Sequence, residues 1–207
     1  SNQIRTRQSR RITFKMKKWI SEYVNEYKRV LDSIPIDQVE SLIKSLKKSL
    51  DRNSQIFVIG NGGSAANASH FVTDLGKGAS GEVGKRFRCL SLNDNVAWMT
   101  ALSNDSDYED VFQQQLINFA KPNDLLIVLS VSGNSPNVVK AISWAKENGM
   151  RTVALAGGQR GKITEIADDS IIVDSKHYGQ VEDAQMTICH ILCYAFIEST
   201  EINRLNS

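Results

Sequence analysis

The feature that most constrains this chain is a repeated alternation of short apolar runs with helix-like segments, which begins at residue 55. Four of the five runs are rich in Val, Ile and Leu, as strands of parallel sheets buried on both faces are. The runs cover residues 55–60, 86–92, 124–130, 151–157 and 169–174. Helix-like segments lie near residues 64–76, 95–120, 136–148, 161–167 and 182–202. This alternation predicts an α/β fold with a doubly wound, five-stranded parallel sheet.

Two further helices are predicted ahead of the first strand, over residues 12–51. Large apolar residues recur there at three- and four-residue spacing on both sides of Pro35, which interrupts the helical pattern. We expect a helical hairpin that buries its wide apolar face on the main domain or on another subunit. A single domain over residues 12–207 is predicted, preceded by a basic, mobile tail over residues 1–11.

Charge and cysteine content narrow the class of protein. The net charge of +2 over 207 residues argues neither for nor against a polyanionic partner. No run of about 18 apolar residues exists, so we expect no membrane association. The three cysteines, Cys89, Cys189 and Cys193, lack metal-binding spacing, and an odd number suits reduced thiols. These features predict a cytoplasmic protein.

Two small-residue loops follow predicted strands, at the edge where open parallel sheets bind ligands. The first is GNGGS at residues 60–64, and the second is SVSGNS at residues 130–135. Glycines let a ligand approach the backbone, and hydroxyls beside a helix N-terminus suit a phosphate. Neither loop has the Walker A or the G-x-G-x-x-G spacing, so no nucleotide cofactor is predicted. Each loop taken alone is equally compatible with a simple tight turn.

His70 and Asp74 lie four residues apart on the helix predicted after the first loop, so they share one face. Side chains of these two types can bind a metal ion or transfer a proton. A single helical histidine is more often a core or surface residue, so the pair by itself leaves both interpretations open.

Four segments together resemble the sugar isomerase (SIS) domain family, in the branch of the phosphoheptose (sedoheptulose 7-phosphate) isomerases. The segments are GNGGSAANASHF, SNDSDYEDVF, VLSVSGNSPNVVKAI and QMTICHIL. The resemblance covers nearly the whole chain. It implies an aldose–ketose isomerase that moves a proton through an ene-diol on a phosphorylated sugar. It also implies one Zn2+ per subunit and a homotetramer with active sites at subunit interfaces.

The resemblance further implies roles for individual residues. Asp74 and His190 match catalytic positions. The implied metal ligands are His70, Asp74, Glu182 and His190. The implied substrate and phosphate contacts are Asn61, Gly62, Gly63, Ser64, Asn104, Asp105, Ser130, Val131, Ser132, Ser135 and Glu182.

The chain departs from the family's pattern at several of these places. Asp74 replaces a Glu and Glu182 replaces a Gln, which keeps two histidines with carboxylates and makes the site more negative. Val131 replaces a Thr, while Gly78 and Gly179 stand near an Arg and an acidic sugar contact. The two glycines affect the expected heptose substrate more than the expected isomerase activity. A related phosphosugar therefore stays open as the substrate.

A non-catalytic SIS protein, either a phosphosugar sensor or an adaptor of the replication-initiation type, is the alternative. The basic N-terminus would suit a partner associated with nucleic acid. An adaptor has no reason, however, to keep His70, Asp74 and His190 together, and the chain has no helix-turn-helix pattern. We therefore expect an isomerase that does not bind nucleic acid.

The spacing of Glu182 and His190 predicts a shared site. Eight residues along a helix correspond to about 12 Å of rise, too far for two side chains to converge on one metal ion. Either Glu182 lies in the loop before the helix, or one of the two comes from a neighbouring chain.

Overall fold

The computed structural model describes the backbone of residues 2–80 and 84–199, and within these ranges the side chains from Lys15 onward. Its centre is a five-stranded sheet of order β2-β1-β3-β4-β5 in which every neighbouring pair is parallel. The strands are β1 (Gln55–Gly60), β2 (Arg88–Ser91), β3 (Leu125–Ser130), β4 (Arg151–Gly157) and β5 (Asp169–Val173). The predicted fold class and all five predicted strands are confirmed.

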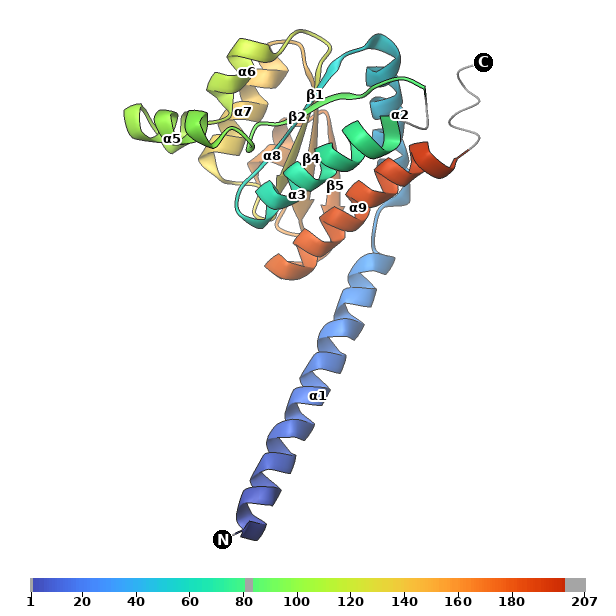
Figure 1. Cartoon of the computed structure of the whole chain (residues 1–207), viewed down its shortest axis with the longest axis vertical. Helices are drawn as coiled ribbons and strands as arrows, with labels where there is room; N and C mark the ends of the chain where they lie inside the picture. Colours follow the sequence, from blue (N-terminus) through green and yellow to red (C-terminus); the bar gives the residue numbers. More distant parts are fainter. Residues whose placement is uncertain (1, 81–83, 200–207) are drawn as a thin grey trace.

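Helices cover both faces of the sheet because successive strand residues point to opposite faces. Ile56 and Val58 of β1 belong to one hydrophobic cluster, and Phe57 and Ile59 belong to the other. The first cluster is covered by α2 (Ile36–Arg52), α3 (Gly63–Thr73) and α9 (Tyr178–Glu198). The second is covered by α6 (Gln113–Phe119), α7 (Pro136–Glu147) and α8 (Lys162–Ile166). Figure 1 shows these two layers on either side of the strands.

The strand order creates a switch point beside β1. The chain passes from β1 to β2 on one side, and β3 then pairs with β1 on the other side. The carboxyl ends of β1 and β3 are therefore neighbours, and in open α/β sheets such a point forms a ligand-binding crevice. Both small-residue loops leave the sheet at this place, which brings their polar groups together.

The helix predicted over residues 95–120 is divided into three elements. These are α5 (Val96–Asp105), the 3₁₀-helix η2 (Tyr108–Asp110) and α6. Asp107 has extended backbone and its side chain accepts a hydrogen bond from the amide of Glu109, so it begins a new element and ends the old one. The interruption places Tyr108 near the switch point.

The last helix begins earlier than predicted. The ring of His177 accepts a hydrogen bond from the amide of Gln180, which caps α9 and starts it at Tyr178. Glu182 therefore lies inside the helix, and the predicted possibility that it lies in the preceding loop is wrong. The predicted end of this helix, at residue 202, falls outside the described residues.

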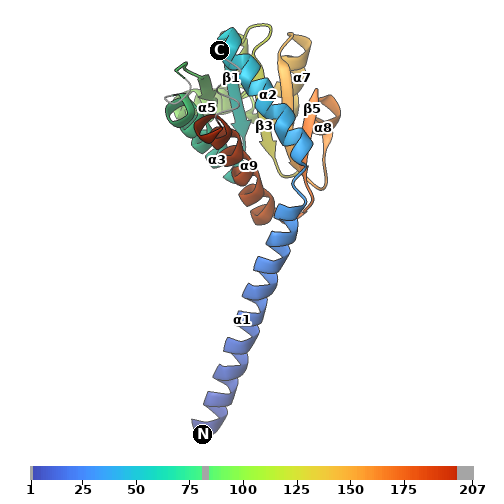
Figure 2. The ribbon, with the colours of Figure 1, turned by 90° about the vertical axis from the view of Figure 1, so that its right-hand side faces the viewer.

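The two predicted N-terminal helices are present, as α1 (Asn2–Asp32) and α2, but they do not fold back on each other. In both views α1 projects away from the domain, while α2 packs against it (Figures 1 and 2). Helix α2 starts after Pro35, with Asp37 in its first turn. Because α1 begins at Asn2, helix extends into the segment predicted to be a tail; the mobility of that segment stays a prediction.

The outer part of α1 presents an apolar stripe that is largely exposed. Met16, Trp19, Ile20 and Val24 have exposed fractions between 45% and 62%. Further along the helix, Val30 is fully buried in the core of the domain. Among the described residues, no helix combines the length and the apolar character needed to cross a membrane.

Candidate active site

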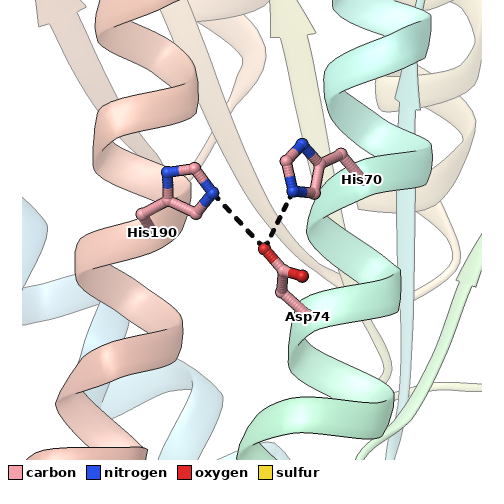
Figure 3. A group of neighbouring side chains, drawn as sticks. All are labelled: His70, Asp74 and His190. Atoms are coloured by element: carbon pink, nitrogen blue, oxygen red, sulfur yellow. Dashed lines mark ion pairs between the residues drawn. The ribbon is translucent and has the colours of Figure 1, made fainter.

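Two histidines and an aspartate meet where α3 packs against α9 (Figure 3). His70 Nε2 lies 3.1 Å from Asp74 Oδ2, and His190 Nε2 lies 3.4 Å from the same oxygen. The two imidazole rings are nearly perpendicular, with centroids 5.1 Å apart. His70 and Asp74 are one helical turn apart, as predicted, and α9 brings His190 to them from 116 residues further along the chain, counted from Asp74.

The chemistry of this group suits a divalent metal ion. One possible ligand atom from each of the three side chains lies within 4.8 Å of the others. Two imidazole nitrogens and a carboxylate oxygen form a common ligand set for zinc, with a further position left for water or substrate. The side chains are 32% to 52% exposed, so a small molecule can reach them. The same groups can also hold and transfer protons.

Asp74 begins a short π-helical segment, η1 (Asp74–Ala79), that continues α3. Single π-helical turns inside helices are frequent at functional sites, because they rotate side chains away from the regular helical positions. Here the π-helical turn begins at Asp74, the residue that both histidines contact.

Glu182 does not join this group within one chain. Its carboxylate lies instead against the start of α3, where a Cβ atom on Gly63 would lie 2.5 Å from the carboxyl carbon. The Glu182 backbone oxygen accepts a hydrogen bond of 2.9 Å from Asn67 Nδ2, which joins α9 to α3. A side chain at position 63 would require the Glu182 carboxylate to move from this place. Glu182 as a metal ligand stays a prediction, and it would require a second chain.

The loop after β3 presents three hydroxyl groups. Ser130 Oγ accepts a hydrogen bond from the amide of Gly133, and Ser132 Oγ accepts one from the amide of Asn134. Ser135 stands at the N-cap of α7 but makes no side-chain capping bond. These hydroxyl hydrogens are therefore available to donate to a phosphate at the N-terminus of α7.

The other predicted residue of this loop has a different place. The Val131 side chain is only 5% exposed and packs in the hydrophobic core. Its side chain therefore takes no part in the loop surface.

The loop after β1 is held from two directions. On the β2 side, the Asn93 side chain bonds both the amide and the carbonyl of Gly60, at 3.2 and 2.7 Å. On the β3 side, the amide group of Asn61 pairs with that of Asn137 on α7. Gly62 and Gly63 are exposed beyond this anchor, whereas Ser64 is 3% exposed.

Asn104 and Asp105 lie at the end of α5, where both side chains are exposed and hydrogen-bonded to each other at 2.8 Å. Tyr108 connects this segment to the first loop, because its hydroxyl donates to Asn61 Oδ1 at 3.0 Å. Asn104 and Tyr108 also line a cavity of about 510 Å³ along α5. The structure thus places three of the predicted substrate-binding segments around the switch point.

The loops are also held by three residues that no pattern in the sequence indicated: Asn93, Tyr108 and Asn137. Tyr108 and Asn137 stand inside segments that carry the family resemblance, but nothing in their spacing indicates which polar groups they contact. Their function depends on loops that only the sheet order brings together.

Residues 22–157 match the family described as the SIS domain. The chain belongs to this family. It is 36% identical to a probable phosphoheptose isomerase of Thermoplasma volcanium, over 84% of this chain and 88% of the relative. It is 40% identical to the phosphoheptose isomerase of Helicobacter pylori strain HPAG1, over 70% of this chain and 76% of the relative. The predicted resemblance is confirmed.

A solved structure of a phosphoheptose isomerase from Neisseria gonorrhoeae superposes on this SIS domain with a TM-score of 0.80 and 25% identity. The match covers 89% of this chain and all of the other.

The two glycine departures have different surroundings in this SIS domain. Gly78 is exposed on η1, and among the described residues a Cβ atom there would come within 4 Å of Ile197 alone, at 3.8 Å. Gly179 lies in the first turn of α9, where a Cβ atom would lie 3.3 Å from the Tyr23 hydroxyl and 3.5 Å from His177. Among the described residues, position 78 thus leaves space for a larger residue, while a larger residue at position 179 would require the Tyr23 hydroxyl of α1 to shift.

Proposed function

We propose that this SIS-domain protein is an aldose–ketose isomerase that converts sedoheptulose 7-phosphate into a heptose 7-phosphate. The proposal rests mainly on one contact: Asp74 Oδ2 lies within 3.4 Å of both His70 Nε2 and His190 Nε2, and all three side chains are accessible. The names of its relatives, which are phosphoheptose isomerases or probable ones, support the same activity.

The reaction needs a base to remove a proton beside the carbonyl, an acid at the oxygen and stabilisation of the negative charge of the ene-diol. Asp74 and His190 supply the base and the acid. The bound sugar decides which of the two acts first. His70 holds the Asp74 carboxylate from the other side. The hydroxyls of residues 130–135 bind the phosphate.

One zinc ion per subunit belongs to this proposal. His70, Asp74 and His190 would hold it, since their donor atoms form a suitable group. When bound, a divalent ion polarises the sugar's oxygens and so stabilises their negative charge. No nucleotide cofactor is involved.

We further propose a homotetramer in which neighbouring chains complete each active site. Two observations support it: the apolar stripe of α1 is largely exposed, and Glu182 lies two turns of α9 away from His190. A second chain would cover the stripe and could bring its Glu182 to the histidines. Exposed apolar patches of this kind are typical of protein–protein interfaces.

Incubation of the purified protein with sedoheptulose 7-phosphate tests the activity. We expect NMR spectra to show a heptose 7-phosphate appearing until a constant isomer ratio is reached, with a panel of ketose phosphates as the comparison. If only another ketose phosphate is converted, the proposed isomerase activity stands and the proposed substrate is wrong. Binding without turnover, with and without added zinc, would favour a phosphosugar sensor.

Mixing inactive chains tests the shared site. Glu182→Ala and His190→Ala chains, dissociated and reassembled together, should regain activity at about a quarter of the sites if assembly is random. Each active site would combine an intact histidine cluster with an intact Glu182 from the other chain. The Asp74→Ala and His190→Ala pair is the matched control, because both changes affect one cluster in one chain and no activity should return.

Light scattering must accompany this experiment. A monomer at micromolar concentration would contradict the tetramer. Failure of the Glu182→Ala and His190→Ala mixture to regain activity would show that each chain forms its own site.

A further inference from the structure

Asn137 is a buried polar residue in the first turn of α7, two positions after Ser135. Its side chain is 2% exposed, although it carries no charge partner and belongs to no hydrophobic cluster. Its amide group pairs with that of Asn61 through two reciprocal hydrogen bonds of 2.9 Å each. Buried polar groups that are fully bonded hold their neighbours in a single arrangement.

The pair uses both lone pairs of each amide oxygen. Asn61 Oδ1 accepts from Asn137 and from the Tyr108 hydroxyl, while Asn137 Oδ1 accepts from Asn61 and from the amide of Val138. A carbonyl oxygen has two lone pairs, so neither oxygen can accept a further strong hydrogen bond. The Asn61 nitrogen, in contrast, has two hydrogens and uses one of them on Asn137. Asn61 can therefore only donate to a ligand.

The Asn61–Asn137 pair lies between the two ligand loops. Asn61 is the first residue after β1, and Asn137 follows the hydroxyl loop after β3, its neighbour in the sheet. The pair thus connects the two loops across the switch point, and Tyr108 attaches the segment of Asn104 and Asp105 to the same amide. A change at Asn137 removes the bonds between the first loop and α7, while Tyr108 can still bond Asn61.

We propose that Asn137 is a positioning residue that fixes the Asn61 amide so that its free N–H, and not its carbonyl, meets an oxygen of the bound phosphosugar. This inference rests on the proposed isomerase function. Without Asn137, the Asn61 amide can rotate by half a turn and present its carbonyl oxygen to a sugar oxygen. Two oxygens facing each other without a hydrogen repel, so binding of substrate and transition state would both weaken.

A double-mutant cycle tests the proposal. Asn137→Ala and Asn61→Ala should each lower kcat/KM for sedoheptulose 7-phosphate about tenfold, the value of one hydrogen bond. If Asn137 acts through Asn61, adding Asn137→Ala to Asn61→Ala should change kcat/KM by less than about twofold. Independent effects that multiply to about a hundredfold would overturn the proposal, as would an unchanged kcat/KM in Asn137→Ala.

Loss of stability is controlled in two ways. Thr152→Val removes a buried hydroxyl that bonds Asp168 at the opposite edge of the sheet, so it should lower stability and leave kcat/KM unchanged. If Asn137→Ala fails to fold, Tyr108→Phe takes its place in the cycle. It removes only the hydroxyl from a side chain that is 50% exposed, and it must also show no further effect in Asn61→Ala.

The affinity for sedoheptulose 7-phosphate, measured by calorimetry on the same variants, separates this proposal from the function. An inactive wild type that still binds the sugar phosphate would refute the isomerase, and the same cycle in Kd would then decide the role of Asn137. A wild type that neither binds nor converts the sugar phosphate would refute both.

Discussion

The Asp74→Asn variant should lose about a thousandfold in kcat/KM while it keeps its fold, because general acid–base groups contribute factors of this size. The amide has the size of the carboxylate but cannot take up a proton at neutral pH. The change also removes the only anion in contact with His70 Nε2 and His190 Nε2 among the described residues. Because Asp74 is 32% exposed, unfolding free energy should change by no more than about 1 kcal/mol.

Zinc affinity gives a second measurement on the same variant. Outer-shell changes at metal sites already cost about 10- to 100-fold in affinity, so loss of a ligand from a three-ligand set should cost at least as much. Calorimetry with the metal-free protein measures this. Asp37→Asn, on the exposed first turn of α2, is the matched control and should alter neither quantity. An Asp74→Asn enzyme with normal turnover would exclude the cluster from the chemistry.

Gly133→Ala should destabilise the domain by about 3 kcal/mol, the upper part of the range for strained positions. Gly133 has a φ of +67°, and an added Cβ would collide with the Arg160 carbonyl oxygen and lie 2.9 Å from its carbon. The loop cannot easily move away. The Gly133 amide donates to Ser130 Oγ and its carbonyl accepts from Ile163, each at 3.1 Å. Urea unfolding measures the loss, and affinity for phosphosugar should fall with it.

Gly84→Ala separates the two causes of the lost stability, which are the left-handed backbone and the collision with Arg160. Gly84 has the same φ of +67°, but an added Cβ would have none of the described residues within 4 Å. Only the cost of the left-handed backbone applies there, about 1 kcal/mol. Equal losses in the two variants would show that the contact with Arg160 contributes nothing to the shape of the hydroxyl loop.

The strands, their parallel arrangement and the two ligand loops could all be predicted from the amino-acid sequence. These follow from local patterns: apolar runs of strand length, helical periodicity between them, and small residues where strands end. His70 and Asp74 share a face for the same local reason, one turn of helix. The position of His190 came only from the family resemblance, since 120 residues separate it from His70 and no local pattern joins them.

Which side chains lie together at the site depends on how the helices and strands pack. Packing of α9 on α3 puts His190 against Asp74, and the same packing leaves Glu182 beside Gly63. The pairing of Asn61 with Asn137 crosses 76 residues and exists because β1 and β3 are neighbours in the sheet. Side-chain caps, such as Asp107, ended a helix whose apolar pattern continues through it. Hydrophobic periodicity fixes which face of an element is buried, but the neighbour that buries it, and thus each contact between distant side chains, depends on how the elements pack together.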